Sequence, residues 1–126
     1  MEIRNGKLSD LEELHENFVH AKGLTHYSIN NDYMYIVEDK GKIIAFLYGD
    51  KTIFSNSGIL LGLEVLKEYR HKGIATNLIK RFENDLKHKY CKQILVFFNN
   101  NDNQLEFYRK VGFKQEDILY AELKEI

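Results

Sequence analysis

The sequence predicts an α/β (α+β) three-layer sandwich, in which helices flank one mixed, mostly antiparallel sheet of about six strands. Two observations predict this class. Three short strand-like runs come early in the chain, and strand-like and helix-like runs then alternate as strand, helix, strand, helix, strand. We expect one domain over residues 1–126, because the chain is long enough for one hydrophobic core and too short for two.

In the first half, the expected strands are short and joined by turns. Ser9 is the expected N-cap of the first helix, and Glu12, three residues later, completes a capping box. The stretch 24–32 is too irregular to assign. The antiparallel strands are expected at 3–4, 33–37 and 43–48, with turns at 39–41 and 55–58.

The second half is expected to begin with a strand over 59–65. The helix that follows has an inward stripe of three apolar residues spaced four apart, Leu78, Phe82 and Leu86. The continuous apolar run 94–98 predicts a strand buried on both faces. The last helix is expected between an N-cap at Asn101 and a C′ residue at Gly112, before a final strand over 118–123.

The composition is typical of a soluble globular protein. Hydrophobic residues make up 44% and charged residues 29%, and the net charge of −1 gives no argument for binding to nucleic acid or to a membrane surface. The single cysteine, Cys91, excludes an intramolecular disulfide and favours a reducing compartment. The first residues are too polar for a signal peptide, and no apolar run approaches membrane-spanning length. We therefore expect a cytoplasmic protein.

A charged turn joins the strand 59–65 to the next helix and forms a candidate phosphate site. The first N–H groups of a helix have no intrahelical partner and carry partial positive charge. Gly73 would let a phosphate approach this backbone, and the small Ala75 keeps the next turn position open. Positive charge is supplied by three residues before the glycine, Arg70, His71 and Lys72. By itself, this pattern fits a basic loop closed by a glycine equally well.

A second motif lies one helix and one strand further on, where Asn101 is followed by Tyr108 and by the pair Gly112-Phe113. Together the two motifs resemble those of the GNAT superfamily of acyl-CoA-dependent N-acetyltransferases. In that family, the first motif cradles the pyrophosphate of coenzyme A, and the second supplies a pantetheine contact and a tyrosine. The resemblance implies the GNAT-like fold with a splayed central parallel pair of strands, acetyl-CoA as cosubstrate, and no metal.

The resemblance also assigns roles to residues. Backbone groups of Leu63 and Val65 would bind pantetheine and polarise the thioester carbonyl, and Asn101 would contact pantetheine. Tyr108 would donate a proton to the coenzyme A sulfur, since a phenol titrates near 10 and a thiol near 8.5. Core packing for Tyr108 and a helix cap for Asn101 are the simpler alternatives. The pyrophosphate would meet the turn and the first helical residues, Arg70, His71, Lys72, Gly73, Ile74 and Ala75.

The general base is less clearly marked. Glu64 is the only carboxylate in its strand and lies beside the expected bulge, although a solvated strand-end carboxylate is the alternative. His26 and Tyr27 lie where relatives often bind the acceptor. Cys91 has the pattern of a packing residue, which favours direct transfer over a cysteinyl intermediate. No metal-ligand spacing involves the five histidines, His15, His20, His26, His71 and His88.

The sequence thus predicts an N-acetyltransferase that moves an acetyl group from acetyl-CoA to a primary amine by direct attack in a ternary complex. A non-catalytic acyl-CoA-binding or regulatory module of the same fold is the first alternative. A nucleotide-binding protein is the second, although both common glycine-rich phosphate motifs are missing from the sequence. The expected partner is a small-molecule or peptide amine. The sequence leaves open which amine it is, how long the acyl chain is, and whether the protein forms a homodimer.

Overall fold

The computed structural model describes residues 1–52, 56–98, 104–115 and 122–126. Its elements, in chain order, are β1 (Ile3–Asn5), the 3₁₀ turn η1 (Leu8–Asp10), α1 (Leu11–Asn17), η2 (Val19–Ala21), α2 (His26–Ile29), β2 (Met34–Asp39), β3 (Lys42–Lys51), β4 (Ser57–Val65), η3 (Lys67–Tyr69), α3 (Ile74–Lys87), β5 (Gln93–Val96) and α4 (Gln104–Lys110).

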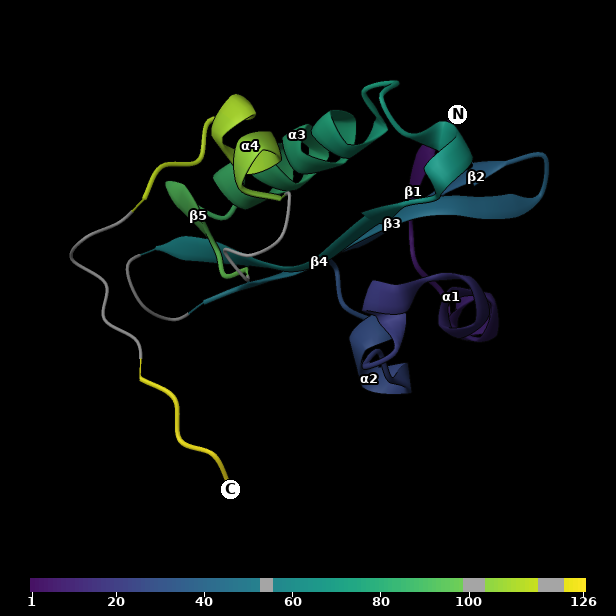
Figure 1. Ribbon diagram of the computed structural model, residues 1–126, viewed down its shortest axis with the longest axis horizontal. Helices are drawn as coiled ribbons and strands as arrows, with labels where there is room; N and C mark the ends of the chain where they lie inside the picture. The colour runs from purple at the N-terminus through teal and green to yellow at the C-terminus, as the bar shows by residue number, and fades with distance from the viewer. Residues whose placement is uncertain (53–55, 99–103, 116–121) are drawn as a thin grey trace.

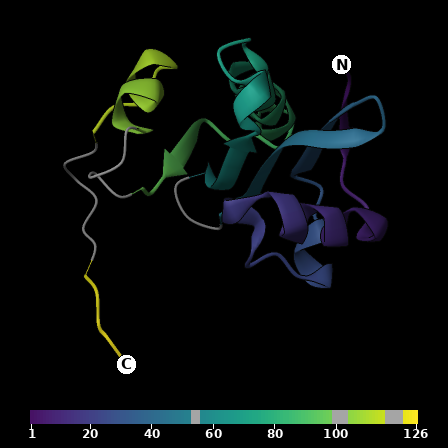
Figure 2. The same cartoon turned by 45° about the vertical axis from the view of Figure 1, so that its right-hand side comes forward.

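One twisted sheet separates two layers of helices. Helices α3 and α4 lie on one face, and α1 and α2 lie on the other (Figures 1 and 2). The strands run in the order β1-β2-β3-β4-β5, and every neighbouring pair is antiparallel except the parallel pair β4 and β5. The predicted three-layer sandwich with a mixed sheet is therefore confirmed.

The described part of the sheet has five strands, where about six were expected. Most of the predicted final strand, residues 118–121, lies outside the described residues, and Glu122 and Leu123 form no strand. No helix within the described ranges combines the length and the apolar character needed to cross a bilayer.

The start of the first helix differs from the prediction. Ser9 lies inside η1 and is not an N-cap. Asp10 organises this turn, because its Oδ2 accepts a hydrogen bond from the Lys7 N–H at 2.8 Å, and its two oxygens accept from the Arg4 guanidinium at 2.8 Å each. The stretch 24–32, which the sequence pattern left unassigned, contains α2. Its N-cap, Thr25, accepts hydrogen bonds from backbone N–H groups through its side chain.

Two apolar clusters fill the spaces on either side of the sheet, as alternation along β2 and β3 requires. The predicted stripe of α3, Leu78, Phe82 and Leu86, is buried against one face. At two points a glycine of the sheet lets this helix pack closely. A Cβ at Gly49 would lie 2.4 Å from the Phe82 ring, and one at Gly58 would lie 2.3 Å from a Leu86 methyl group.

The parallel pair β4 and β5 separates beyond Leu60. The two strands pair only from Ser57 to Leu60, whereas β4 continues beside β3 as far as Val65. A bulge marks the point of separation, because Leu60 and Gly62 face consecutive residues of β3 and Leu61 is the extra residue between them. The strand predicted over 94–98 ends earlier, at Val96, and the prediction that it is buried on both faces is wrong. The Phe97 side chain, just past the end of β5, is 63% exposed.

Candidate active site

The N-terminus of α3 forms an open cradle of backbone. Gly73 is the N-cap and has a left-handed backbone with φ of +82°, and a Cβ built on it would meet nothing within 4 Å. The first intrahelical bond runs from the Asn77 N–H to the Gly73 C=O at 3.0 Å, so the preceding N–H groups of this turn have no helical partner. Ile74 buries its side chain in the core, which leaves its backbone as the group that a ligand could meet.

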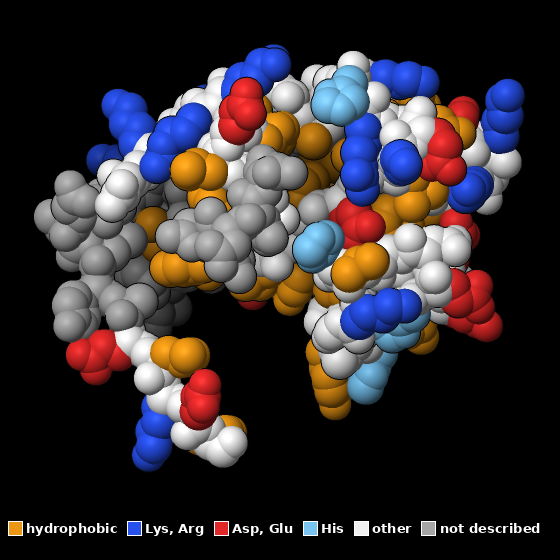
Figure 3. All heavy atoms as spheres, viewed as in Figure 1, with side chains coloured by type: hydrophobic (Ala, Val, Ile, Leu, Met, Phe, Trp, Pro, Cys, Tyr) orange, Lys and Arg blue, Asp and Glu red, His pale blue; other side chains and the backbone are white. Residues whose placement is uncertain are grey.

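The basic residues before the cradle are held by neighbours. Arg70 donates its Nε–H to the Val65 C=O at 2.8 Å, which ties the turn to the end of β4. The Lys72 ammonium lies 5.6 Å from the centre of the Tyr69 ring, and the Tyr69 hydroxyl donates to Asp39 at 2.9 Å. Figure 3 shows Lys and Arg side chains at the upper right, where Figure 1 places η3 and the turn before α3, and others at the upper left.

Two peptide groups of β4 face the gap between the parallel strands. The Leu66 N–H donates to the Ile44 C=O of β3 at 2.9 Å. Because peptide groups alternate in direction along a strand, those of Leu63 and Val65 point away from β3. The Val65 C=O accepts a hydrogen bond from the Arg70 Nε–H and not from β3, which agrees with this direction. No residue of β5 pairs with β4 beyond Leu60, so neither neighbouring strand takes up these backbone groups.

A pocket of about 220 Å³ lies in this gap. It is lined by β4 residues 60–63, by residues 96–98 at the end of β5, by Gln104 and Tyr108 of α4, and by His20 of η2. A larger hollow of about 690 Å³, near the C-terminal end of α3, contains none of the predicted site residues. We take the smaller pocket as the candidate active site, because it joins the free peptide group of Leu63 to Tyr108.

Tyr108 is buried beside this pocket, with 6% of its surface exposed. Its ring stacks on Phe98 with centroids 4.8 Å apart and makes edge contacts with Phe107 and Phe113. Burial raises the pKa of the Tyr108 phenol, so the hydroxyl stays protonated at neutral pH. Within the described ranges the hydroxyl has no hydrogen-bond partner, which leaves it free to donate to a ligand.

The end of α4 fixes the position of this tyrosine. Gly112 has φ of +106°, and the Phe113 N–H donates to the Tyr108 C=O at 2.9 Å. This is a Schellman cap, so the predicted C′ glycine is confirmed. Asn101 lies outside the described residues.

Glu64 lies on the other face of the sheet from Tyr108. Its Oε1 accepts a hydrogen bond from the backbone N–H of His20 at 2.8 Å, and this contact brings η2 to β4. His20 was named in the sequence only as one of five histidines, and the structure places it in the pocket lining. No local signal could have identified it, because its partner is 44 residues away.

The other candidates for acceptor or metal binding lie apart from the pocket. His26 and Tyr27 stack on each other on α2, with ring centroids 4.1 Å apart, and do not line it. Cys91 is buried, as expected of a packing residue. The described part of the chain holds no group of three side chains that could bind a metal ion.

A mixed sheet that opens at a bulge between its parallel strands, with a helix N-terminus at one side and a buried tyrosine at the other, defines an acyl-CoA N-acyltransferase fold. The sequence matches the Acetyltransferase (GNAT) family over residues 4–113. The chain belongs to that family, and the resemblance of its two motifs is confirmed.

Among curated proteins, the chain is 33% identical over 79 residues to YdhI of Bacillus subtilis (strain 168), an uncharacterized protein. The match covers 62% of this chain and 47% of YdhI, so the chain spans about half of that relative.

Solved structures share the fold at low sequence identity. The paia N-acetyltransferase from Thermoplasma acidophilum, in complex with coenzyme A, superposes with a TM-score of 0.78 at 23% identity over 92% of this chain and 91% of that one. The aminoglycoside 6′-N-acetyltransferase AAC(6′)-IG from Acinetobacter haemolyticus gives 0.74 at 21% identity over 100% and 99%. A ribosomal-protein-alanine N-acetyltransferase from Brucella melitensis biovar Abortus 2308 gives 0.75 at 14% identity over 98% and 100%.

Proposed function

We propose that this protein transfers an acetyl group from acetyl-CoA to a primary amine by direct attack in a ternary complex. One observation carries the proposal. The Leu63 peptide group, which is hydrogen-bonded to neither β3 nor β5, and the Tyr108 side chain meet at one pocket, on a sheet whose end also bears the open N-terminus of α3. Family membership supports the acetyl transfer, and the coenzyme A complex of the Thermoplasma relative supports the cofactor.

The cradle at α3 would hold the pyrophosphate. Its backbone N–H groups and helix dipole favour an anion, and the turn before it adds the positive charge of Arg70 and Lys72. His71, which has a positive φ of 62°, would present backbone to the same phosphates. The Arg70 Nε–H is already used by the Val65 C=O, so the outer guanidinium nitrogens would meet the phosphate. Ala75, half-buried in the first turn of α3, keeps a larger side chain out of the cradle.

The strand backbone and the tyrosine would divide the chemistry. The pantetheine arm would lie in the gap between β4 and β5, and the family resemblance implies that Asn101 contacts it. The N–H groups of Leu63 and Val65 would stabilise the charge that develops on the thioester oxygen. Such a donor lowers the barrier by on the order of 2.7–4 kcal/mol in comparable sites. The Tyr108 hydroxyl would protonate the departing thiolate, since burial keeps it neutral.

The acceptor is a small-molecule or peptide amine. Two relatives of this fold are described as an aminoglycoside and a ribosomal-protein-alanine acetyltransferase, so one fold serves different amines. Identification of the amine therefore needs a direct screen.

Calorimetric titration with acetyl-CoA, coenzyme A and ATP, together with an assay of free-thiol release, tests the proposal. We expect both coenzyme A species to bind and ATP not to compete. Thiol release should depend on added amine and should fall on the order of 100-fold in Tyr108→Phe without loss of acetyl-CoA affinity. Binding without turnover on any amine would indicate the non-catalytic acyl-CoA-binding module. Binding of ATP alone would indicate a nucleotide-binding protein.

A further inference from the structure

We infer that His20 accepts the proton that the attacking amine loses, and that Glu64 positions His20 and is not itself the base. This inference rests on the proposed acetyl transfer and deepens it. Glu64 is the carboxylate that the sequence suggests for the role, but His20 is the one of the two that lines the pocket.

Contacts across the sheet hold His20 in place. The Glu64 carboxylate accepts from the His20 N–H at 2.8 Å, although 44 residues separate the two. The two segments are also in contact at Gly62, where a Cβ would lie 3.7 Å from the His20 carbonyl oxygen. His20 thereby reaches the pocket beside Leu61, the bulge residue.

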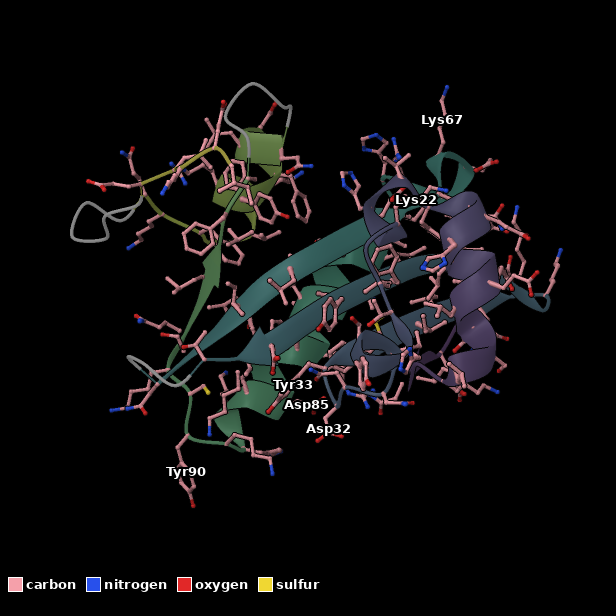
Figure 4. The ribbon with its side chains drawn as sticks, turned by 90° about the horizontal axis from the view of Figure 1, so that it is seen from below. Lys22, Asp32, Tyr33, Lys67, Asp85 and Tyr90 are labelled. Atoms are coloured by element: carbon pink, nitrogen blue, oxygen red, sulfur yellow. The ribbon has the colours of Figure 1, made fainter. Side chains whose placement is uncertain are left out.

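The two groups proposed to transfer protons, Tyr108 and His20, come from opposite faces of the sheet. Tyr108 and the cradle of α3 come from the α3–α4 face, so coenzyme A and its sulfur would occupy that side. His20 comes from the opposite face, with α1 and α2. Figure 4, which looks onto this face, shows the chain around Lys22, just past η2, lying across β4. An amine that enters from this face would attack one face of the planar thioester carbonyl and would have His20 beside it.

The chemistry balances with these two groups. The neutral amine nitrogen bonds to the thioester carbon and becomes positively charged, and its proton passes to a ring nitrogen of His20. The carbon–sulfur bond breaks with its electron pair on sulfur, which takes the Tyr108 proton. The products are the amide and coenzyme A thiol. Solvent then removes the proton from His20 and returns one to Tyr108.

The two candidates differ in the atoms that they have available. An imidazole is the side-chain base best suited to neutral pH, and among the described residues the His20 ring has no hydrogen-bond partner, so a ring nitrogen is free. One oxygen of Glu64 already holds the His20 backbone, and Glu64 does not line the pocket. Glu64 therefore contacts His20 and does not itself reach the pocket where the reaction would occur.

Conservative substitutions separate the two roles. Steady-state thiol release is measured with kanamycin, spermidine and a peptide with an N-terminal alanine as acceptors, and acetyl-CoA affinity and melting temperature are measured for every variant. We expect His20→Gln to lower kcat on the order of 100-fold with acetyl-CoA affinity retained. Glu64→Gln, whose amide oxygen can still accept from the His20 N–H, should lose less than tenfold, and Glu64→Ala should lose more. His88→Gln, an exposed histidine at the end of α3, is the matched control.

Chemical rescue tests whether His20 is the base. In His20→Ala, added imidazole should restore amine-dependent release above the rate seen with imidazole alone. A kcat lost in Glu64→Gln but kept in His20→Gln would make Glu64 the base and overturn the inference. An unaffected kcat in both would assign the proton to water and overturn it equally. Acetyl-CoA binding without turnover in the wild type would overturn the reaction itself and the role of His20 with it.

Discussion

The pair of substitutions Gly73→Ala and Gly41→Ala separates cofactor binding from backbone strain. Both glycines have a left-handed backbone, with φ of +82° and +80°, and a Cβ on either would meet nothing within 4 Å. Each alanine therefore costs only the left-handed strain of about 1–2 kcal/mol, without a steric clash. Both variants should melt a few degrees lower than the wild type, by similar amounts.

Only the variant at α3 should lose affinity for coenzyme A. Gly41 lies in the tight turn between β2 and β3, whereas Gly73 opens the cradle where the pyrophosphate would approach. A methyl group at Gly73 would displace the phosphate from one backbone N–H. A hydrogen bond to a charged group contributes about 1.5–3 kcal/mol, so we expect Kd to rise about 10- to 150-fold.

Calorimetry with coenzyme A and thermal unfolding of both variants provide the test. Gly41→Ala should bind as the wild type does. Equal losses of affinity in the two variants would mean that strain alone, transmitted through the fold, weakens binding. An unchanged Kd in Gly73→Ala would refute the reasoning, because the phosphate would then not approach the backbone at this turn.

Two further predictions concern stability. Gly49→Ala should destabilise the protein by about 1–3 kcal/mol in urea unfolding, because its Cβ would clash with the Phe82 ring, and adding Phe82→Leu should recover part of that loss. Burial by itself would raise the pKa of Asp10, but hydrogen bonds from Arg4 and from backbone outweigh it and lower that pKa. Its stabilising effect is then present above the unfolded pKa of about 3.9 and is lost as pH falls through the lower folded value. The unfolding free energies of wild type and Asp10→Asn should therefore converge in acid and differ at neutral pH; a constant difference would contradict this account.

The parts of the fold that follow from local pattern were predictable. The stripe of α3 and the turn that ends in Gly73 are contiguous in sequence, so periodicity and a glycine at a helix start were enough to place them. The helix start at Ser9 was predicted wrongly because a contact with the preceding strand decides it. Arg4 of β1 binds Asp10 through two nitrogens, and no local capping preference records that contact.

The site shows the same division. Tyr108 could be singled out because it belongs to a motif within one helix. His20 could not, since it reaches the pocket only through the packing of η2 on Gly62 and the bond to Glu64. Likewise, the apolar run after residue 93 gave no sign that its last residues would be partly exposed, because that depends on where β4 separates from β5.

The bulge at Leu61 connects these features. Before the bulge, the Thr52 N–H donates to the Ser57 C=O, so the odd-numbered residues of β4 form the hydrogen bonds to β3. After the bulge, the Leu66 N–H donates to the Ile44 C=O, so the even-numbered residues form them. Without the extra residue, the peptide groups of Leu63 and Val65 would be hydrogen-bonded to β3. Side chains reverse at the same point. The Cβ direction of Gly58 faces α3 and that of Gly62 faces η2.

The reversal also explains why Glu64 faces His20. With a regular strand, Glu64 would point toward α3, where a carboxylate would meet the apolar core, and Leu63 and Val65 would leave that core. One inserted residue thus frees the backbone donors on the cofactor side and, on the other side, turns the carboxylate that holds His20. The proposed oxyanion donors and the proposed base therefore depend on the same local irregularity, which explains how two faces of one strand can serve a single pocket.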